Sequence, residues 1–240
     1  MRRVVLSPRE WHPSSFVSKL VQQVKPVSTP ELIQQLFIVV YECGDCRDWN
    51  ATGRLLISNA IKANPRRKRS VITALDNIYE QHRLSDVHGD LGYILEWCFA
   101  YFLRVHGRRL LGPNKERFSV VMQSRVIDSQ SGQAVVSGPG DEDRTLDVTA
   151  AYVDSSGTVI CAMGFESKYN LGTAITNTEF HRQLQYLDHL SKVVAHFRTF
   201  IAVCTEFQVI AYSDRYSSLC RSNNIADVPL FSISNLIEGG

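Results

Sequence analysis

Hydrophobic and polar positions follow two different patterns along this chain of 240 residues. Up to about residue 84, apolar residues keep helical spacing, as at positions 16, 17, 20, 21 and 24 and again at 32, 33, 36, 37 and 40. The segments SPRE and STPE place Ser or Thr before Pro and Glu, which is typical of a helix start. Two further helices are predicted over about 52–63 and 70–83. We therefore expect an all-α N-terminal region over residues 1–84.

The rest of the chain, residues 85–240, begins with a helix and continues with strands. The helix is SDVHGDLGYILEWCFAYFLRVHG, with caps at Ser85 and Asp86 and Gly107 at its end. Runs rich in Val, Ile, Thr and aromatic residues predict strands in ERFSVVMQSRVI, LDVTAAYV, TVICAMGFESK, RTFIAVCTE and FQVIAYS. An amphipathic helix over about 177–197 separates the third run from the fourth, and the polar segment 127–143 is expected to be a surface hairpin or loop. This order predicts an α/β core with a central mixed sheet flanked by helices.

The composition indicates where in the cell the protein is expected, but it says little about its function. The chain is 44% hydrophobic and 21% charged, and its net charge of +2 is too small to indicate nucleic-acid binding by itself. The apolar stretch LIQQLFIVVY is too short to span a bilayer, and Arg2 and Arg3 precede SPREWHPSS rather than an apolar signal core. We expect an intracellular protein, cytoplasmic or nuclear, with no membrane partner and with cysteines that are mostly free.

Cys43 and Cys46 form a CxxC in YECGDCRDW, which leaves two interpretations open. The pair is half of a zinc site, with His82 and His88 as distant ligands, or it is a plain turn at a helix end. No second CxxC and no closely spaced HxxxH follows in the sequence. The pattern therefore favours the turn.

The candidate chemistry lies in GFESKYN, residues 164–170, at the end of an apolar strand. Because side chains alternate along a strand, Glu166 and Lys168 share one face and Ser167 points away. Only the turn VDSSGT separates this strand from the run that contains Asp147, so a hairpin would bring Asp147 beside Glu166. Two acids held close repel each other unless a cation lies between them, and Mg²⁺ binds one or two carboxylates together with waters and phosphate oxygens. The alternative is a strand end with an ordinary salt bridge.

The order of Asp, an apolar hairpin and then Glu-x-Lys resembles the PD-(D/E)XK nuclease superfamily over about residues 85–215. The resemblance implies a restriction-endonuclease-like core and Mg²⁺-dependent phosphodiester hydrolysis, with Mn²⁺ as a substitute. It implies two sets of site residues: Asp147, Glu166, Lys168, Glu96, Gln183 and Tyr186 as the catalytic set, and Asp147, Glu166, Glu96 and the carbonyl of Ser167 as metal ligands. Leu146 replaces the proline of the family pattern, and Gln183 and Tyr186 are three residues apart rather than four.

Basic residues indicate where a nucleic acid would be bound, because they neutralise phosphates. The candidate contacts are Arg66, Arg67, Lys68, Arg69, Arg108, Arg109 and Arg182. A solvated loop and a nuclear import signal are the alternatives for residues 66–69. We expect a DNA endonuclease, with a homodimer to supply two active sites. The alternatives are an RNA-directed nuclease and a non-catalytic nucleic-acid-binding or assembly module on the same fold.

Overall fold

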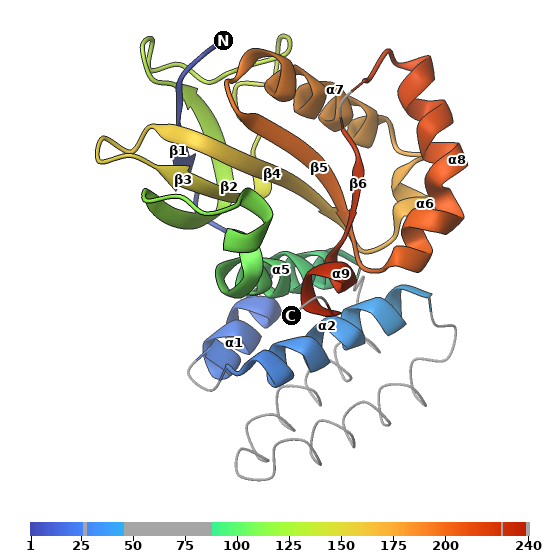
Figure 1. The fold of residues 1–240 in the computed structure, drawn as a ribbon. Coiled ribbons are helices and arrows are strands. Elements are labelled where there is room, and N and C mark those ends of the chain that lie inside the picture. Colours follow the sequence, from blue (N-terminus) through green and yellow to red (C-terminus); the bar gives the residue numbers. More distant parts are fainter. Residues whose placement is uncertain (26–27, 46–87, 227, 239–240) are drawn as a thin grey trace. The chain divides into compact units, whose positions relative to one another are not determined.

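The computed structural model describes residues 1–25, 28–45, 88–226 and 228–238 (Figure 1). It divides into two compact units, one formed by Met1–Trp11 with Phe99–Gly240 and the other by His12–Cys98. The positions of these units relative to one another are not determined. The predicted helices over 52–63 and 70–83 lie outside the described residues, as do the basic run at 66–69 and the side chains of the CxxC motif.

The larger unit is built on one mixed sheet of six strands in the order β1-β2-β3-β4-β5-β6. The pairs β1–β2, β2–β3 and β3–β4 are antiparallel, whereas the pairs β4–β5 and β5–β6 are parallel. Their bounds are Val4–Pro8, Arg117–Asp128, Leu146–Val153, Val159–Lys168, Phe197–Val203 and Leu230–Ser232. The prediction of an α/β fold with a central mixed sheet is confirmed.

Two layers of side chains cover the sheet, and alternation along β4 separates them. Phe165 packs edge-on against Phe99 of α5 (His88–Leu111), with 4.9 Å between the ring centroids. On the other face, Leu184 and Leu187 of α7 (Thr178–Val193) belong to a buried apolar cluster that includes Leu146, Ala162 and Phe197. Figure 1 shows α7 alongside β5. Residue 164 and, by the same alternation, Glu166 therefore face α7.

The remaining helices are α1 (Ser15–Val24), α2 (Pro30–Asp45), α6 (Leu171–Ala174), α8 (Glu206–Ser222) and α9 (Ile233–Glu238). The predicted strand FQVIAYS is wrong, because this segment forms the first turns of α8. Thr205 caps the helix by accepting a hydrogen bond from the backbone N–H of Gln208. Phe207 and Ile210 are 67% and 68% exposed, whereas Val209 and Tyr212 pack against the buried apolar cluster, so the run has one face in solvent and one on the core, as a helix does.

The prediction of an all-α region over residues 1–84 is wrong for its beginning, where β1 pairs antiparallel with β2 from Val4↔Asp128 to Pro8↔Ser124. Val4 is buried, and the segment VVL has the β-branched character of a strand. Its pairing partner lies more than a hundred residues away in the chain, so the local sequence did not show that this short segment would join the sheet. α1 and α2 do form within the region that was expected to be helical.

Among the residues that the structure describes, no helix combines the length and the apolar character that crossing a membrane requires.

Gly164 lies where β4 packs closely against Leu146 and Phe197. A Cβ at this position would lie 2.7 Å from Cδ1 of Leu146 and 2.9 Å from Cε1 of Phe197, nearer than packed side chains allow. We expect Gly164→Ala to lower the free energy of unfolding by about 1–3 kcal/mol, measured by urea unfolding. Gly92→Ala is the matched control, since a Cβ there meets nothing within 4 Å. An equal loss in both variants would contradict this account of Gly164.

Candidate active site

Asp147 and Glu166 lie at the same end of two paired strands, as the short turn between them in the sequence predicted. β3 and β4 are antiparallel with Val148 opposite Phe165, and each carboxylate lies one residue beyond that pair. The turn between the strands is short because Asp154 organises it: its side chain accepts hydrogen bonds from the N–H groups of Ser156 and Thr158. The structure therefore brings the two carboxylates and Lys168 to one end of the paired strands β3 and β4.

Asp147 is held against β4 by Ser167. Its Oδ2 accepts hydrogen bonds from the backbone N–H of Ser167 at 2.7 Å and from the Ser167 hydroxyl at 2.9 Å. Its Oδ1 accepts a longer bond, 3.4 Å, from the side-chain amide of Gln123 on β2. Gln123 has a φ of 46°, an uncommon backbone conformation for a residue with a side chain. Sequence reasoning missed Gln123, since nothing in MQSR marks it.

Glu166 is nearly enclosed, with a side chain 13% exposed, and it is the electrostatic centre of the site. Its Oε1 accepts a hydrogen bond from Nζ of Lys168 at 2.5 Å, and its Oε2 accepts one from Nε2 of Gln183 at 2.9 Å. Burial, with the nearby charge of Asp147 as the second cause, raises the pKa of Glu166 to about 7 against the opposing effect of Lys168. The negative charge at this position is therefore under-compensated by the protein itself.

This donor set fits a divalent cation of the magnesium type. Within the described part of the chain, no group of three or more His, Cys, Asp and Glu side chains is gathered into a ready-made metal cluster. Mg²⁺ does not require one, because it binds through one or two carboxylates and completes its shell with waters and phosphate oxygens. A cation beside Asp147 and Glu166 would also offset the effects of burial and of the charge of Asp147, which together raise the pKa of Glu166.

Lys168 faces the same way as Glu166, as alternation predicted. Its side chain is 27% exposed, it forms an ion pair with Glu166, and its Nζ lies 6.0 Å from the centroid of the Phe180 ring. The salt bridge considered as the alternative interpretation is thus present. A salt bridge alone does not require a second carboxylate beside it, however, and Asp147 makes the charge of Glu166 less favourable rather than more.

Gln183 links Glu166 to a further basic residue on the approach to β3. Its Nε2 donates to Glu166 and to the carbonyl of Thr145 at 3.2 Å, while its Oε1 accepts from Arg144 at 2.9 Å. Arg144 is also bonded to Glu179 at 2.7 Å. These contacts orient the amide of Gln183, and through it the carboxylate of Glu166. Arg144 was not anticipated from the sequence, although it lies only three residues before Asp147.

Tyr186 has a different environment from the rest of the predicted set. It is 1% exposed and belongs to the apolar cluster between α7 and the sheet. Burial raises the pKa of its hydroxyl well above the ordinary value. The structure therefore places Tyr186 in the core, where it packs, while Gln183 one turn earlier reaches the carboxylates.

The other predicted residues are less directly placed. Glu96 is half-buried on α5 in the His12–Cys98 unit, whose position relative to the sheet is not determined, so its role stays a prediction. The guanidinium of Arg108 lies 5.6 Å from the ring centroid of Phe118, whose strand partner Tyr152 is about 17 Å along β3 from Asp147. Arg109 donates to the carbonyl of Leu236. The nucleic-acid contacts expected of Arg108 and Arg109 also stay predictions.

The fold and the site together define an α/β protein with two carboxylates and a lysine at the end of an antiparallel strand pair. Comparison of the chain with protein-family models and with curated proteins finds no match. Its function is therefore argued from these residues.

Because the pKa of Glu166 is raised, the free energy of unfolding of the metal-free protein is expected to depend on pH. The unfolded chain releases this proton near 4.5 and the folded protein near 7, so the folded state binds more protons between these values. The contribution of protonated Glu166 to the free energy of unfolding is fully present below pH 4.5. It should be lost as the pH rises through 7, which lowers the free energy of unfolding by on the order of 1–3 kcal/mol. Urea unfolding in EDTA across this range measures the loss, and Glu166→Gln should flatten it. The same pH dependence in both proteins would contradict the assignment.

Proposed function

We propose that this protein is a Mg²⁺-dependent nuclease of the PD-(D/E)XK type that hydrolyses phosphodiester bonds, with DNA as substrate and internal cleavage as its mode. The observation that carries the proposal is Lys168 in contact with Glu166 at 2.5 Å, next to Asp147, at one end of β3 and β4. Mn²⁺ would substitute for Mg²⁺. Cutting both strands of a duplex calls for two active sites, which a homodimer would supply.

Each residue of the site has a role in this proposal. Asp147, Glu166 and the Ser167 carbonyl hold the ion, with Glu96 as a further carboxylate ligand. When bound, the ion supplies a water of lowered pKa and neutralises charge on the phosphoryl group. Lys168 donates to the attacking water or to a phosphate oxygen, a task that suits a compact ammonium whose pKa is readily shifted. Gln183 keeps Oε2 of Glu166 in place through the 2.9 Å hydrogen bond.

Incubation of the purified protein with plasmid DNA or with RNA, in Mg²⁺, Mn²⁺ or EDTA, tests the proposal. Nicked or linear plasmid that forms with either metal and not with EDTA is the expected result. Cleavage of RNA alone would make the protein an RNA-directed nuclease. Binding of either nucleic acid without cleavage would support the non-catalytic module instead.

A further inference from the structure

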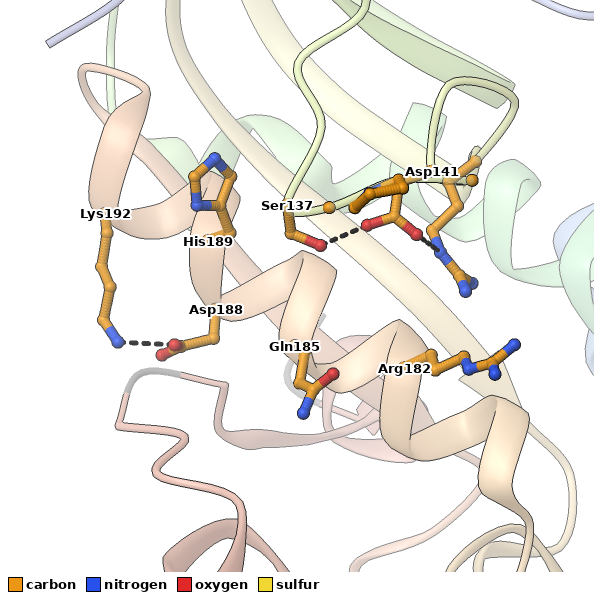
Figure 2. Close-up of a pocket in the computed structure, with 11 residues that line it drawn as sticks. Ser137, Asp141, Arg182, Gln185, Asp188, His189 and Lys192 are labelled. Atoms are coloured by element: carbon orange, nitrogen blue, oxygen red, sulfur yellow. Dashed lines mark hydrogen bonds and ion pairs between the residues drawn. The ribbon is translucent and has the colours of Figure 1, made fainter.

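A polar pocket of about 580 Å³ lies on α7, on the side away from the apolar cluster. One wall is the loop of residues 137–141, and the other is a row of side chains on α7: Arg182, Gln185, His189 and Lys192 (Figure 2). These four positions follow one another at three or four residues, so they form a single stripe along the helix. Ten residues of helix separate the first from the last, which is about 15 Å.

The pocket is formed because the loop of residues 137–141 folds back over the helix. The segment 127–143 was expected to be a surface hairpin or loop, yet Val135 and Asp141 within it are buried. The wall that it contributes is SGPG followed by Asp141, and the two glycines leave backbone rather than side chains facing the pocket. Of the residues that line the pocket, Pro139 alone is apolar. Such a cavity favours a polar ligand over an apolar one.

The charges in the pocket favour an anion. Asp141 is occupied by Ser137 and Arg144, and Asp188 accepts from Lys192 at 2.5 Å and from the N–H of Ala226 at 3.0 Å. Both acids are therefore engaged within the protein, and Asp188 keeps the N–H of Ala226 when Lys192, whose side chain is 48% exposed, also contacts a ligand. Arg182 is 68% exposed, and its ion pair with Glu179 is long, at 3.8 Å. Its guanidinium can turn to a ligand at little cost, since exposed ion pairs of this kind contribute little.

The pocket is connected to the candidate active site by one residue. Arg144 lines the pocket, and it also donates to Oε1 of Gln183, whose Nε2 holds Glu166. A strand whose phosphate lies in the carboxylate site would therefore continue along α7 into the pocket.

We propose that this pocket binds two phosphates of the nucleic-acid strand, beside the scissile one, with Arg182 contacting the first and Lys192 the second. The proposal rests on the proposed function for the identity of the strand. It assigns a role to Lys192 and to the loop of residues 137–141, neither of which the sequence indicated.

The test is the salt dependence of binding to a labelled single-stranded oligodeoxynucleotide of about 12 nucleotides, in EDTA so that no cleavage occurs. The double variant Arg182→Ala/Lys192→Ala should bind on the order of tenfold more weakly, and its slope of log K against log salt should fall by about 1.4, or 0.7 for each lost phosphate contact. Arg182→Lys/Lys192→Arg keeps both charges and should keep the slope. Arg221→Ala, exposed in the last turn of α8, is the control and should change neither quantity.

The outcomes separate this inference from the proposed function. A slope that is unchanged in the double variant, or reduced equally in Arg221→Ala, overturns the pocket proposal even if the protein cleaves DNA. A protein that binds the oligonucleotide through the pocket but cleaves nothing retains the pocket and loses the nuclease. Competition by inorganic phosphate or a mononucleotide, abolished in the double variant while oligonucleotide affinity stays the same, would assign the pocket to a free anion and overturn the strand proposal.

Discussion

Replacing Asp147 or Glu166 by Ala is expected to abolish metal binding and cleavage together. Asp147 is fixed by two hydrogen bonds from Ser167, and Glu166 by one each from Lys168 and Gln183, so both carboxylates are held in place before any ion arrives. Removal of either one takes a charged ligand from the end of β3 and β4, so the ion has fewer protein contacts with which to compete against water. Cleavage should fall to the level seen in EDTA, and calorimetric titration with Mn²⁺ should show no binding.

Asp147→Asn and Glu166→Gln test the same point with less disturbance of shape. Asp214→Ala, an exposed carboxylate on α8, is the matched control and should leave both metal binding and cleavage intact. Full cleavage by Asp147→Ala or by Glu166→Ala would remove that residue from the proposed metal site.

Lys168→Ala should lower the rate of hydrolysis while metal and nucleic acid remain bound. The expected loss is on the order of 10²–10⁴-fold if the ammonium acts as a general acid–base group. The assay belongs above pH 7, because Lys168 lowers the pKa of Glu166 and its removal would raise that pKa further from about 7. A rate profile over several pH values above 7 separates the loss of Lys168 from incomplete ionisation of Glu166 in the variant.

The controls separate chemistry from charge. Lys115→Ala removes an exposed ammonium elsewhere and should leave the rate unchanged. Lys168→Arg keeps the positive charge, but a guanidinium does not give up its proton, so this variant should bind metal and nucleic acid as the wild type does and still hydrolyse slowly. Undiminished hydrolysis in Lys168→Ala would leave GFESKYN as a salt-bridged strand end and nothing more.

The part of the site that the sequence predicted correctly depends on local rules. Only the turn around Asp154 and Gly157 joins the two strands, and Gly157 has the positive φ of 84° that such a tight connection uses. A short hairpin and side-chain alternation are then enough to place Asp147, Glu166 and Lys168 at one end of the sheet. Gln183 was expected from the resemblance to the nuclease superfamily, on a helix that the apolar spacing predicted.

The parts that were missed depend on contacts between distant segments. β1 needs β2 as its partner. Gln123 reaches Asp147, and Arg144 reaches Gln183, only once β2 and α7 are packed around β3. α8 was misassigned because its apolar run resembles a strand, although Thr205 and Gln208 form the spacing of a capping box, which indicates a helix start. The capping spacing predicted the helix correctly. The apolar residues misled because nothing in the sequence showed that Phe207 and Ile210 would face solvent.

The central claim is that Asp147 and Glu166 together hold the ion on which cleavage depends. Its most direct test is the initial rate of plasmid cleavage by the wild type and by Glu166→Gln across a Mg²⁺ titration at pH 8, with EDTA as the zero point. The account predicts a wild-type rate that rises with Mg²⁺ to saturation and vanishes in EDTA, beside a variant that stays at the EDTA level throughout. Wild-type cleavage that persists in EDTA, or two titration curves that superimpose, would contradict it.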